Sequence, residues 1–293
     1  DLTVTGVQTC ALPILKFLQD YGLPISLSEA GPGIDEIIVL SHWLMLVLFV
    51  GWGAFFIISL VKFRASKNPD ADHMGVKSHF SSVLEVAVAV IEIVLLIGFA
   101  FPIWANRVND VPTSGEGAVH IRVVAQQYAW NIHYPGADGI FAVSKPELID
   151  EVDNPIGLDR SSPGSGDDFY TINQMHIPVN KKIRIDLTTK DVIHSFKLPE
   201  LRVGQDAIPG MSIPVHFKAN TTSEEFLKKM VGTPREGKGL EIACAQLCGL
   251  GHYRMRGYLT IDTEDDYNLW LELQAQYLEE DSEEDEWGDE DDW

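Results

Sequence analysis

The strongest constraint on this chain is an apolar run, residues 37–61, that contains no Asp, Glu, Lys or Arg. A helix that crosses a bilayer needs about 20 consecutive, mainly apolar residues. A run of this length would be unusual in the core of a water-soluble domain. We therefore expect it to span a membrane as a helix.

A second apolar run, residues 83–105, is interrupted only by Glu85 and Glu92. Together the two runs predict a transmembrane helical hairpin over residues 35–106. Positive charge favours the cytoplasmic side of a membrane, and the loop between the runs is basic. We expect this loop inside the cell and everything after about Asn106 outside. The basic residues of the loop are Lys62, Arg64, Lys67 and Lys77.

The N-terminal segment has no initiating methionine and lacks the basic start and long apolar centre of a signal peptide. We interpret residues 1–14 as a non-native, artefactual stretch, so Cys10 is assigned no role. Residues 15–34 contain two prolines and three glycines. They are expected to form an irregular lead-in on the external side.

Residues 115–278 have the pattern of an all-β domain. Alternating apolar and polar residues predict half-buried strands at 119–125 and 182–187, and a closing strand is expected at 257–261. Short strands separated by turn residues indicate a sandwich or barrel. Residues 154–168 are so rich in turn formers that we expect an exposed excursion there.

The end of the chain combines a helical pattern with a strongly acidic segment. Thr263 and Asp266 are expected to cap a helix that packs on the domain through a stripe containing Tyr267 and Trp270. Residues 279–293 include eleven acidic and no basic residues, and the whole chain has a formal net charge of −21. Because like charges repel, we expect a disordered tail. It would either solubilise the protein or attract a basic partner.

Two thiols, an imidazole and a thioether lie within twelve residues near the end of the β domain. They belong to Cys244, Cys248, His252 and Met255. Soft sulfur donors with nitrogen point to copper rather than magnesium or calcium. A further ligand is expected from elsewhere. His194 is a candidate, because it lies in a predicted strand that ends at a proline.

These residues alone leave several kinds of site open. The two cysteines could form a disulfide, which is common in oxidising compartments. Zinc accepts two cysteines and two histidines but does not need a methionine. A single-copper site uses two histidines, one cysteine and a weak axial methionine. This chain offers that set and one extra thiolate, with which two sulfurs could bridge two coppers.

The loop resembles the dinuclear copper A motif of subunit II of haem–copper cytochrome c oxidases, Cys-x3-Cys-x3-His-x2-Met. The upstream Asp-Val-x-His-Ser-Phe segment that contains His194 resembles the same family. The resemblance covers about residues 35–278 and implies a membrane-anchored chain, in which a two-helix hairpin precedes a cupredoxin-like sandwich or barrel.

This resemblance also implies roles for the ligands. Cys244 and Cys248 would bridge the two coppers, each histidine would bind one copper, and Met255 would be a weak ligand. Gln246 would contribute its backbone carbonyl. Many family members have glutamate at that position, whose carboxylate also reaches a magnesium ion, so the glutamine here speaks against such a magnesium site.

The implied function is electron transfer in a terminal oxidase of a bacterial plasma membrane. Electrons would come from cytochrome c or a membrane-bound haem protein and pass to haem in subunit I, which reduces oxygen. The implied partners are subunits I and III. No nucleic acid is expected to bind. Tyr128 and Trp130 resemble the aromatic electron-entry region, and Glu85 matches a proton-entry glutamate. The alternative is a membrane-tethered copper-binding or copper-delivery protein.

Overall fold

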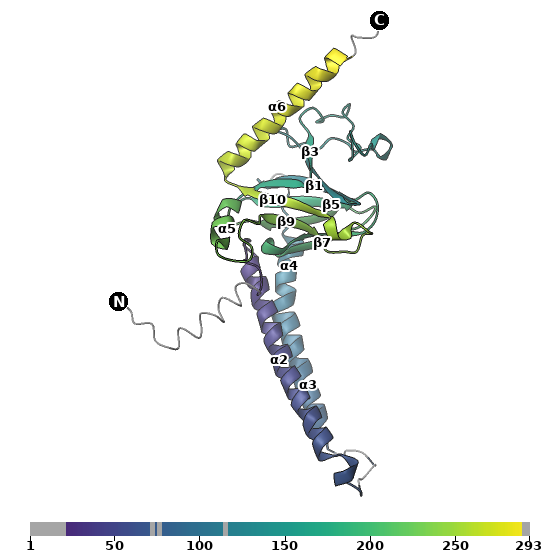
Figure 1. Ribbon diagram of the computed structural model, residues 1–293, viewed down its shortest axis with the longest axis vertical. Helices are drawn as coiled ribbons and strands as arrows, with labels where there is room; N and C mark the ends of the chain where they lie inside the picture. The colour runs from purple at the N-terminus through teal and green to yellow at the C-terminus, as the bar shows by residue number, and fades with distance from the viewer. Residues whose placement is uncertain (1–21, 71–73, 75–77, 114–116, 289–293) are drawn as a thin grey trace, which may run out of the picture. The chain divides into compact units, whose positions relative to one another are not determined.

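The computed structural model describes residues 22–70, 74, 78–113 and 117–288. The interpretation of residues 1–14 and the last five residues of the predicted tail lie outside this part of the chain. The chain forms two compact units (Figure 1). One unit is Pro32–Asp110, and the other joins the segment up to Gly31 with the chain from Val111 onward.

The first unit is a pair of apolar helices. Helix α2 spans Gly31–Lys62, and a second, nearly continuous helix consists of α3 (Phe80–Leu95), the π-helical turn η2 (Leu96–Ala100) and α4 (Phe101–Asn109). Both are long and apolar enough to cross a membrane, with mean hydropathies of 2.6 and 2.7. α2 begins before the predicted residue 35 because Pro32 is compatible with the first turn of a helix.

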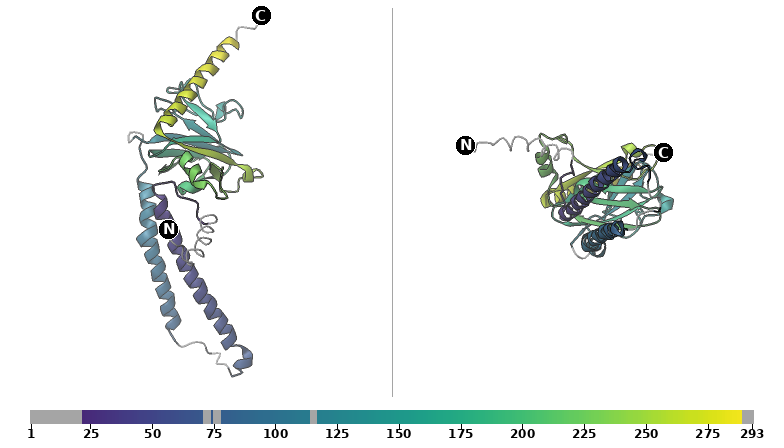
Figure 2. Two further views of the ribbon diagram at one scale, coloured as in Figure 1. Left: turned by 60° about the vertical axis from the view of Figure 1, so that its left-hand side comes forward. Right: turned by 90° about the horizontal axis from the view of Figure 1, so that it is seen from below.

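The two helices run side by side (Figure 2), and a groove between them is lined from both sides. Glu92 of α3 and Ser41 of α2 both line this groove, among apolar side chains. The π-helical turn directly follows, just before Pro102. A proline removes one backbone hydrogen bond from a helix, which accounts for a local widening at this place. The short η1 (Ala65–Lys67) lies beyond the end of α2.

The second unit is a sandwich of two five-stranded sheets. The first sheet has the order β3-β2-β1-β5-β8, and the second has the order β4-β10-β9-β6-β7. The strands of the first sheet are β1 (Val119–Gln126), β2 (Ala129–Tyr134), β3 (Phe169–Ile172), β5 (Lys182–Thr189) and β8 (Ile213–Lys218). Those of the second are β4 (Gln174–Pro178), β6 (His194–Leu198), β7 (Val203–Ala207), β9 (Leu240–Cys244) and β10 (Arg256–Asp262). The three strands predicted from alternation and position are therefore present.

Alternating residues of both sheets fill the space between them. β1 and β5 pair in parallel, and their inward side chains, such as Ile121 and Ile185, are fully buried. Leu27, from the irregular segment that precedes α2, is fully buried in the same core. Its backbone bonds to Glu200 and Asn220 hold the segment there. This part of the predicted lead-in is thus irregular but packed into the domain.

Short helices close the edges of the sandwich. α5 (Ser223–Met230) has a capping box in which Thr222 and Glu225 satisfy each other's backbone N–H groups. The described part of this unit also contains the 3-10 turns η3 (Pro146–Leu148), η4 (Pro199–Leu201) and η5 (His252–Arg254). η4 ends β6 at Pro199, as the sequence predicted.

The sequence was misleading for residues 154–168, which were predicted to be exposed. Residues 155–159 are buried, and Ile156 and Leu158 form a small second core with Ala142. Val124 and Tyr170 pack against this core. The turn-forming residues determine the path of the backbone, and the few apolar side chains between them pack together and become buried.

The predicted disordered tail also needs correction. Helix α6 spans Glu264–Gly288, so residues 279–288 are helical. Thr263 and Asp266 cap its start, and Trp270 and Leu271 pack against the main core. Once a helix is nucleated and docked, each added residue gains a backbone hydrogen bond. Extending this helix into the acidic segment therefore costs less free energy than nucleating a new helix there.

Candidate metal centre

The two motif cysteines lie at one end of the second sheet. β9 ends at Cys244, and the following loop, residues 245–255, leads back into β10. The Sγ atoms of Cys244 and Cys248 are 3.8 Å apart. A disulfide has an S–S distance of about 2.05 Å, and both thiols are free. The sulfurs are thus close enough to share metal ions without being bonded to each other.

Each sulfur faces its own imidazole. His194 starts β6, which pairs with β9 so that Phe196 lies opposite Cys244. This register places His194 Nδ1 3.9 Å from the Sγ of Cys244. On the other side, His252 Nδ1 lies 3.6 Å from the Sγ of Cys248. The strand pairing and the loop therefore supply one nitrogen to each sulfur.

The two remaining predicted ligands complete the group. The backbone carbonyl of Gln246 lies 3.2 Å from the Sγ of Cys244. The Sδ of Met255 lies 3.7 Å from the Sγ of Cys248, and both side chains are buried. All six predicted ligand groups are thus brought together. The donors are thiolate, imidazole, thioether and one carbonyl, which is a set that suits copper.

The two thiols have opposite electrostatic environments. Burial opposes ionisation of Cys244, but hydrogen bonds from His194 and from the backbone at Ser195 and Gln246 outweigh it and lower the pKa of Cys244. Burial, followed by repulsion from a Cys244 thiolate, raises the pKa of Cys248. In the metal-free protein, Cys244 is therefore the thiol that ionises more readily.

Residues outside the motif hold the ligands in place. The Nε2 of His194 lies 2.8 Å from Asp191 Oδ1, which orients the ring so that Nδ1 faces the sulfur. Asp191 Oδ2 accepts a hydrogen bond from the backbone N–H of Gln127 (2.6 Å). The side chain of Gln127 in turn donates to the carbonyl of Cys248 (2.5 Å). Gln127 and Asp191 thus connect the two halves of the site, a role that the sequence did not reveal.

The two predicted electron-entry aromatics differ in exposure. Tyr128 is partly exposed and lies against the metal loop: a Cβ at Gly251 would come within 2.5 Å of its ring, and one at Gly249 within 2.6 Å of its hydroxyl. Trp130 is fully buried, with its ring centroid 6.2 Å from that of His194. A docked protein could contact Tyr128 but not Trp130.

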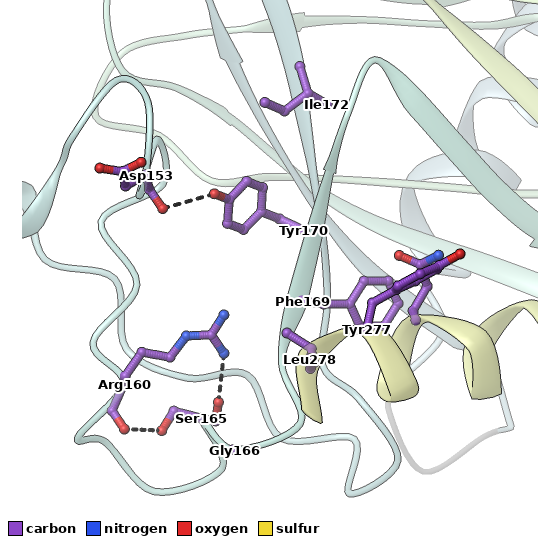
Figure 3. Close-up of a pocket in the computed structure, with 10 residues that line it drawn as sticks. Asp153, Arg160, Ser165, Gly166, Phe169, Tyr170, Ile172, Tyr277 and Leu278 are labelled. Atoms are coloured by element: carbon purple, nitrogen blue, oxygen red, sulfur yellow. Dashed lines mark hydrogen bonds between the residues drawn. The ribbon is translucent and has the colours of Figure 1, made fainter. Parts of the chain in front are cut away.

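A separate hollow of about 820 Å³ lies between β3, α6 and the loop of residues 135–168 (Figure 3). Its wall combines aromatic rings, such as Tyr170, with the guanidinium of Arg160, which donates to the carbonyl of Ser165. The residues that line it include no cysteine or histidine. It is therefore not part of the metal centre.

Comparison with known proteins relates this chain to cytochrome c oxidase subunit II. Residues 119–259 match the family model for cytochrome c oxidase subunit II, periplasmic domain. The alternative cytochrome c oxidase subunit 2 of Bradyrhizobium diazoefficiens is 28% identical over 245 residues, covering 83% of this chain and 81% of the relative. Cytochrome c oxidase subunit 2 of Cereibacter sphaeroides is 26% identical, covering 92% of this chain and 91% of the relative.

A crystal structure of the periplasmic domain of subunit II of cytochrome oxidase from Bradyrhizobium japonicum aligns with a TM-score of 0.38. It is 27% identical and covers 57% of this chain and 99% of that domain.

The matched segment begins at β1 and ends within β10, and it contains the whole metal centre. The relatives extend the match to most of the chain, including the apolar helices. The protein is accordingly membrane-anchored with an extracytoplasmic β domain. These matches support the assignment of the chain to the cytochrome c oxidase subunit II family.

Proposed function

We propose that this chain is the electron-transfer subunit of a haem–copper terminal oxidase and holds a dinuclear copper A centre. The observation that carries the proposal is the pair of sulfurs 3.8 Å apart, each facing its own imidazole nitrogen. A single-copper site needs only one thiolate, so the second cysteine is best explained by a second copper. When bound, the copper pair supplies a one-electron couple shared by two metals.

The chain's own residues prepare the site for this couple. Strand pairing fixes His194 and Cys244, and the hydrogen bonds of Asp191 and Gln127 fix the histidine and the loop. Rigid ligands that move little on oxidation or reduction favour fast electron transfer. Buried Met255 on the Cys248 side keeps water away from that sulfur.

Electrons would enter from a cytochrome c or a membrane-bound haem protein docked over Tyr128. Tyr128 is the partly exposed ring beside the loop, and it packs against Gly249 next to Cys248. Trp130 would then act behind the site, against His194, rather than at the docking surface. The electrons would pass to haem in subunit I, where oxygen is reduced.

The helical hairpin would hold the domain beside subunits I and III in a bacterial plasma membrane. Glu85, in the first turns of α3, would serve proton entry. In the assembled oxidase, Glu85→Ala should slow proton-coupled turnover and leave the copper spectrum unchanged. Normal turnover of this variant would remove Glu85 from the proposed pathway.

Copper loading of the full-length chain tests the main proposal. The metal-free protein, in detergent, would be titrated with copper and followed by metal analysis and electron paramagnetic resonance. We expect two coppers per chain and one unpaired electron delocalised over both. A single mononuclear copper signal would overturn the proposal. It would favour the alternative, a membrane-tethered copper-delivery protein, which should also release its copper readily to an acceptor.

A further inference from the structure

A second group of possible ligands lies on the loop of residues 135–168, which connects β2 to β3. Asp138 stands near the start of this loop, and Asp167 and Asp168 stand at its end. One oxygen of each carboxylate lies within 4.8 Å of an oxygen of the other two. A cation placed among the three carboxylates would be attracted by all of them.

Asp168 gives the strongest sign of a ligand. It is fully buried, and its Oδ2 receives His133 Nε2 at 2.6 Å and the backbone N–H of Ala142 at 2.8 Å. Its Oδ1 is buried and has no hydrogen-bond partner. A buried carboxylate oxygen without a partner is costly. With Oδ2 engaged, Oδ1 is the oxygen that is left to bind a cation.

The cationic side chains nearby are committed elsewhere. The guanidinium of Arg122 stacks on Phe141 at 4.2 Å and donates to the carbonyl of Ala142, and that of Arg160 donates to the backbone carbonyls of Ser165 and Asp168. The charge of Arg122 interacts with two carboxylates, those of Asp186 and Asp168. His133 uses its Nε2 on Oδ2 of Asp168. These hydrogen bonds go to backbone carbonyls and to Oδ2 of Asp168, so none of them is made to its Oδ1.

The other two carboxylates are already held in fixed orientations. Asp167 Oδ2 accepts hydrogen bonds from the backbone N–H groups of Ala137 (2.6 Å) and Asp138 (3.0 Å). Asp138 Oδ1 accepts one from the backbone N–H of Ile140 (2.7 Å). A site whose ligands are fixed before binding loses little conformational entropy when the ion arrives.

We propose that Asp138, Asp167 and Asp168 bind a calcium ion. Carboxylate oxygens are the ligands of hard cations, and Ca²⁺ binds them at about 2.3–2.6 Å. Two oxygens on opposite sides of such an ion are about 5 Å apart, which accommodates the observed spacing of up to 4.8 Å. Mg²⁺ needs bonds of about 2.0–2.1 Å and near-octahedral geometry, which is a tighter arrangement. Copper prefers the soft donors of the other centre.

The ion would connect the two ends of the loop. Asp138 lies at the beginning of the loop and the other two carboxylates at its end, so one ion closes a loop that also carries the small core of Ala142, Ile156 and Leu158. A ligand that binds only the folded loop stabilises it by mass action. Calcium should therefore protect this loop without changing the copper centre.

The test uses the full-length, copper-loaded chain in detergent, freed of calcium by chelation and dialysis. Isothermal titration with calcium chloride should show one Ca²⁺ per chain, and proteolysis within residues 135–168 should slow when calcium is added. Asp138→Asn should weaken calcium binding by about tenfold or more, because affinity follows the charge of the ligands. Asp138 is exposed, so this substitution should not disturb folding.

Asp153→Asn is the matched control, because Asp153 is an exposed carboxylate in the same loop and outside the cluster. It should bind calcium like the unaltered chain. An unchanged copper spectrum in both variants shows that the domain is folded. The proposal is overturned if the unaltered chain gives no saturable calcium heat, if Mg²⁺ binds equally well, or if the two variants bind calcium equally.

Discussion

Two loops of the β unit hold clustered ligand side chains, but they are built in opposite ways. The metal loop, residues 245–255, is short, joins the neighbouring strands β9 and β10, and gains its outside ligand from the start of β6. The long loop, residues 135–168, contains one 3-10 turn and two isolated β-bridges, and it relies on its own small core and acidic side chains. One site is thus fixed by sheet register and the other by packing within a loop. Damage to one should leave the other intact.

Cys248→Ser should have the largest effect and should be confined to the metal loop. It removes the sulfur that lies between Cys244, His252 and Met255. We expect loss of the dinuclear copper signal, measured by electron paramagnetic resonance and metal content. Cys10→Ser is the control, because no role is assigned to Cys10. Two coppers with a delocalised electron in the Cys248 variant would contradict the assignment of both thiols as bridges.

Leu158→Ala should weaken the long loop and spare the metal loop. Leu158 is 3% exposed and belongs to the small second core, and such truncations of buried leucines cost roughly 2–5 kcal/mol. We expect a cost near the lower end of this range, because few side chains surround Leu158. The measurement is the free energy of unfolding of the metal-free chain. Leu148→Ala, in the same loop but 40% exposed, should cost much less. Equal costs for the two variants would show that the second core contributes nothing.

The same contrast explains what the sequence could predict. Four of the proposed ligands, Cys244, Cys248, His252 and Met255, could be predicted because thiol, imidazole and thioether side chains recur at short spacing in one segment. His194 was predicted from a separate strand, and the role of Gln246 rested on the family resemblance. The strands at Val119 and Lys182 were identifiable because alternation reports a sheet with one buried face. The apolar helices followed from length and the absence of charge.

Other features depend on contacts between distant residues. Ile156 and Leu158 lie among turn formers, and no periodicity marks them as buried. The bridge from Gln127 to Cys248 spans residues far apart in sequence, and a lone glutamine carries no motif. The helical end of α6 depends on nucleation by a docked segment, so charge alone wrongly predicted disorder over residues 279–288.

Met255→Leu should produce a moderate effect within the metal loop. The substitution keeps an apolar side chain of similar volume but removes the sulfur 3.7 Å from Cys248. We expect two coppers to remain bound and the reduction potential to change by roughly 59 mV or less, which is up to a tenfold change in the electron-transfer equilibrium. Redox titration measures this, with the exposed Met211→Leu as the control. An unchanged potential would remove Met255 from the set of tuning ligands.

The smallest expected difference is between the two thiols of the metal-free protein. The thiolate is the reactive form of cysteine. Because its pKa is lowered, Cys244 should react with iodoacetamide near neutral pH, whereas Cys248, whose pKa is raised, should react only at more alkaline pH. Burial of Cys248 adds to this order. Mass spectrometry of the Cys10→Ser chain, sampled over pH, would follow each thiol separately. If both thiols showed the same dependence on pH, the hydrogen bonds from His194 and the backbone would not be what lowers the pKa of Cys244.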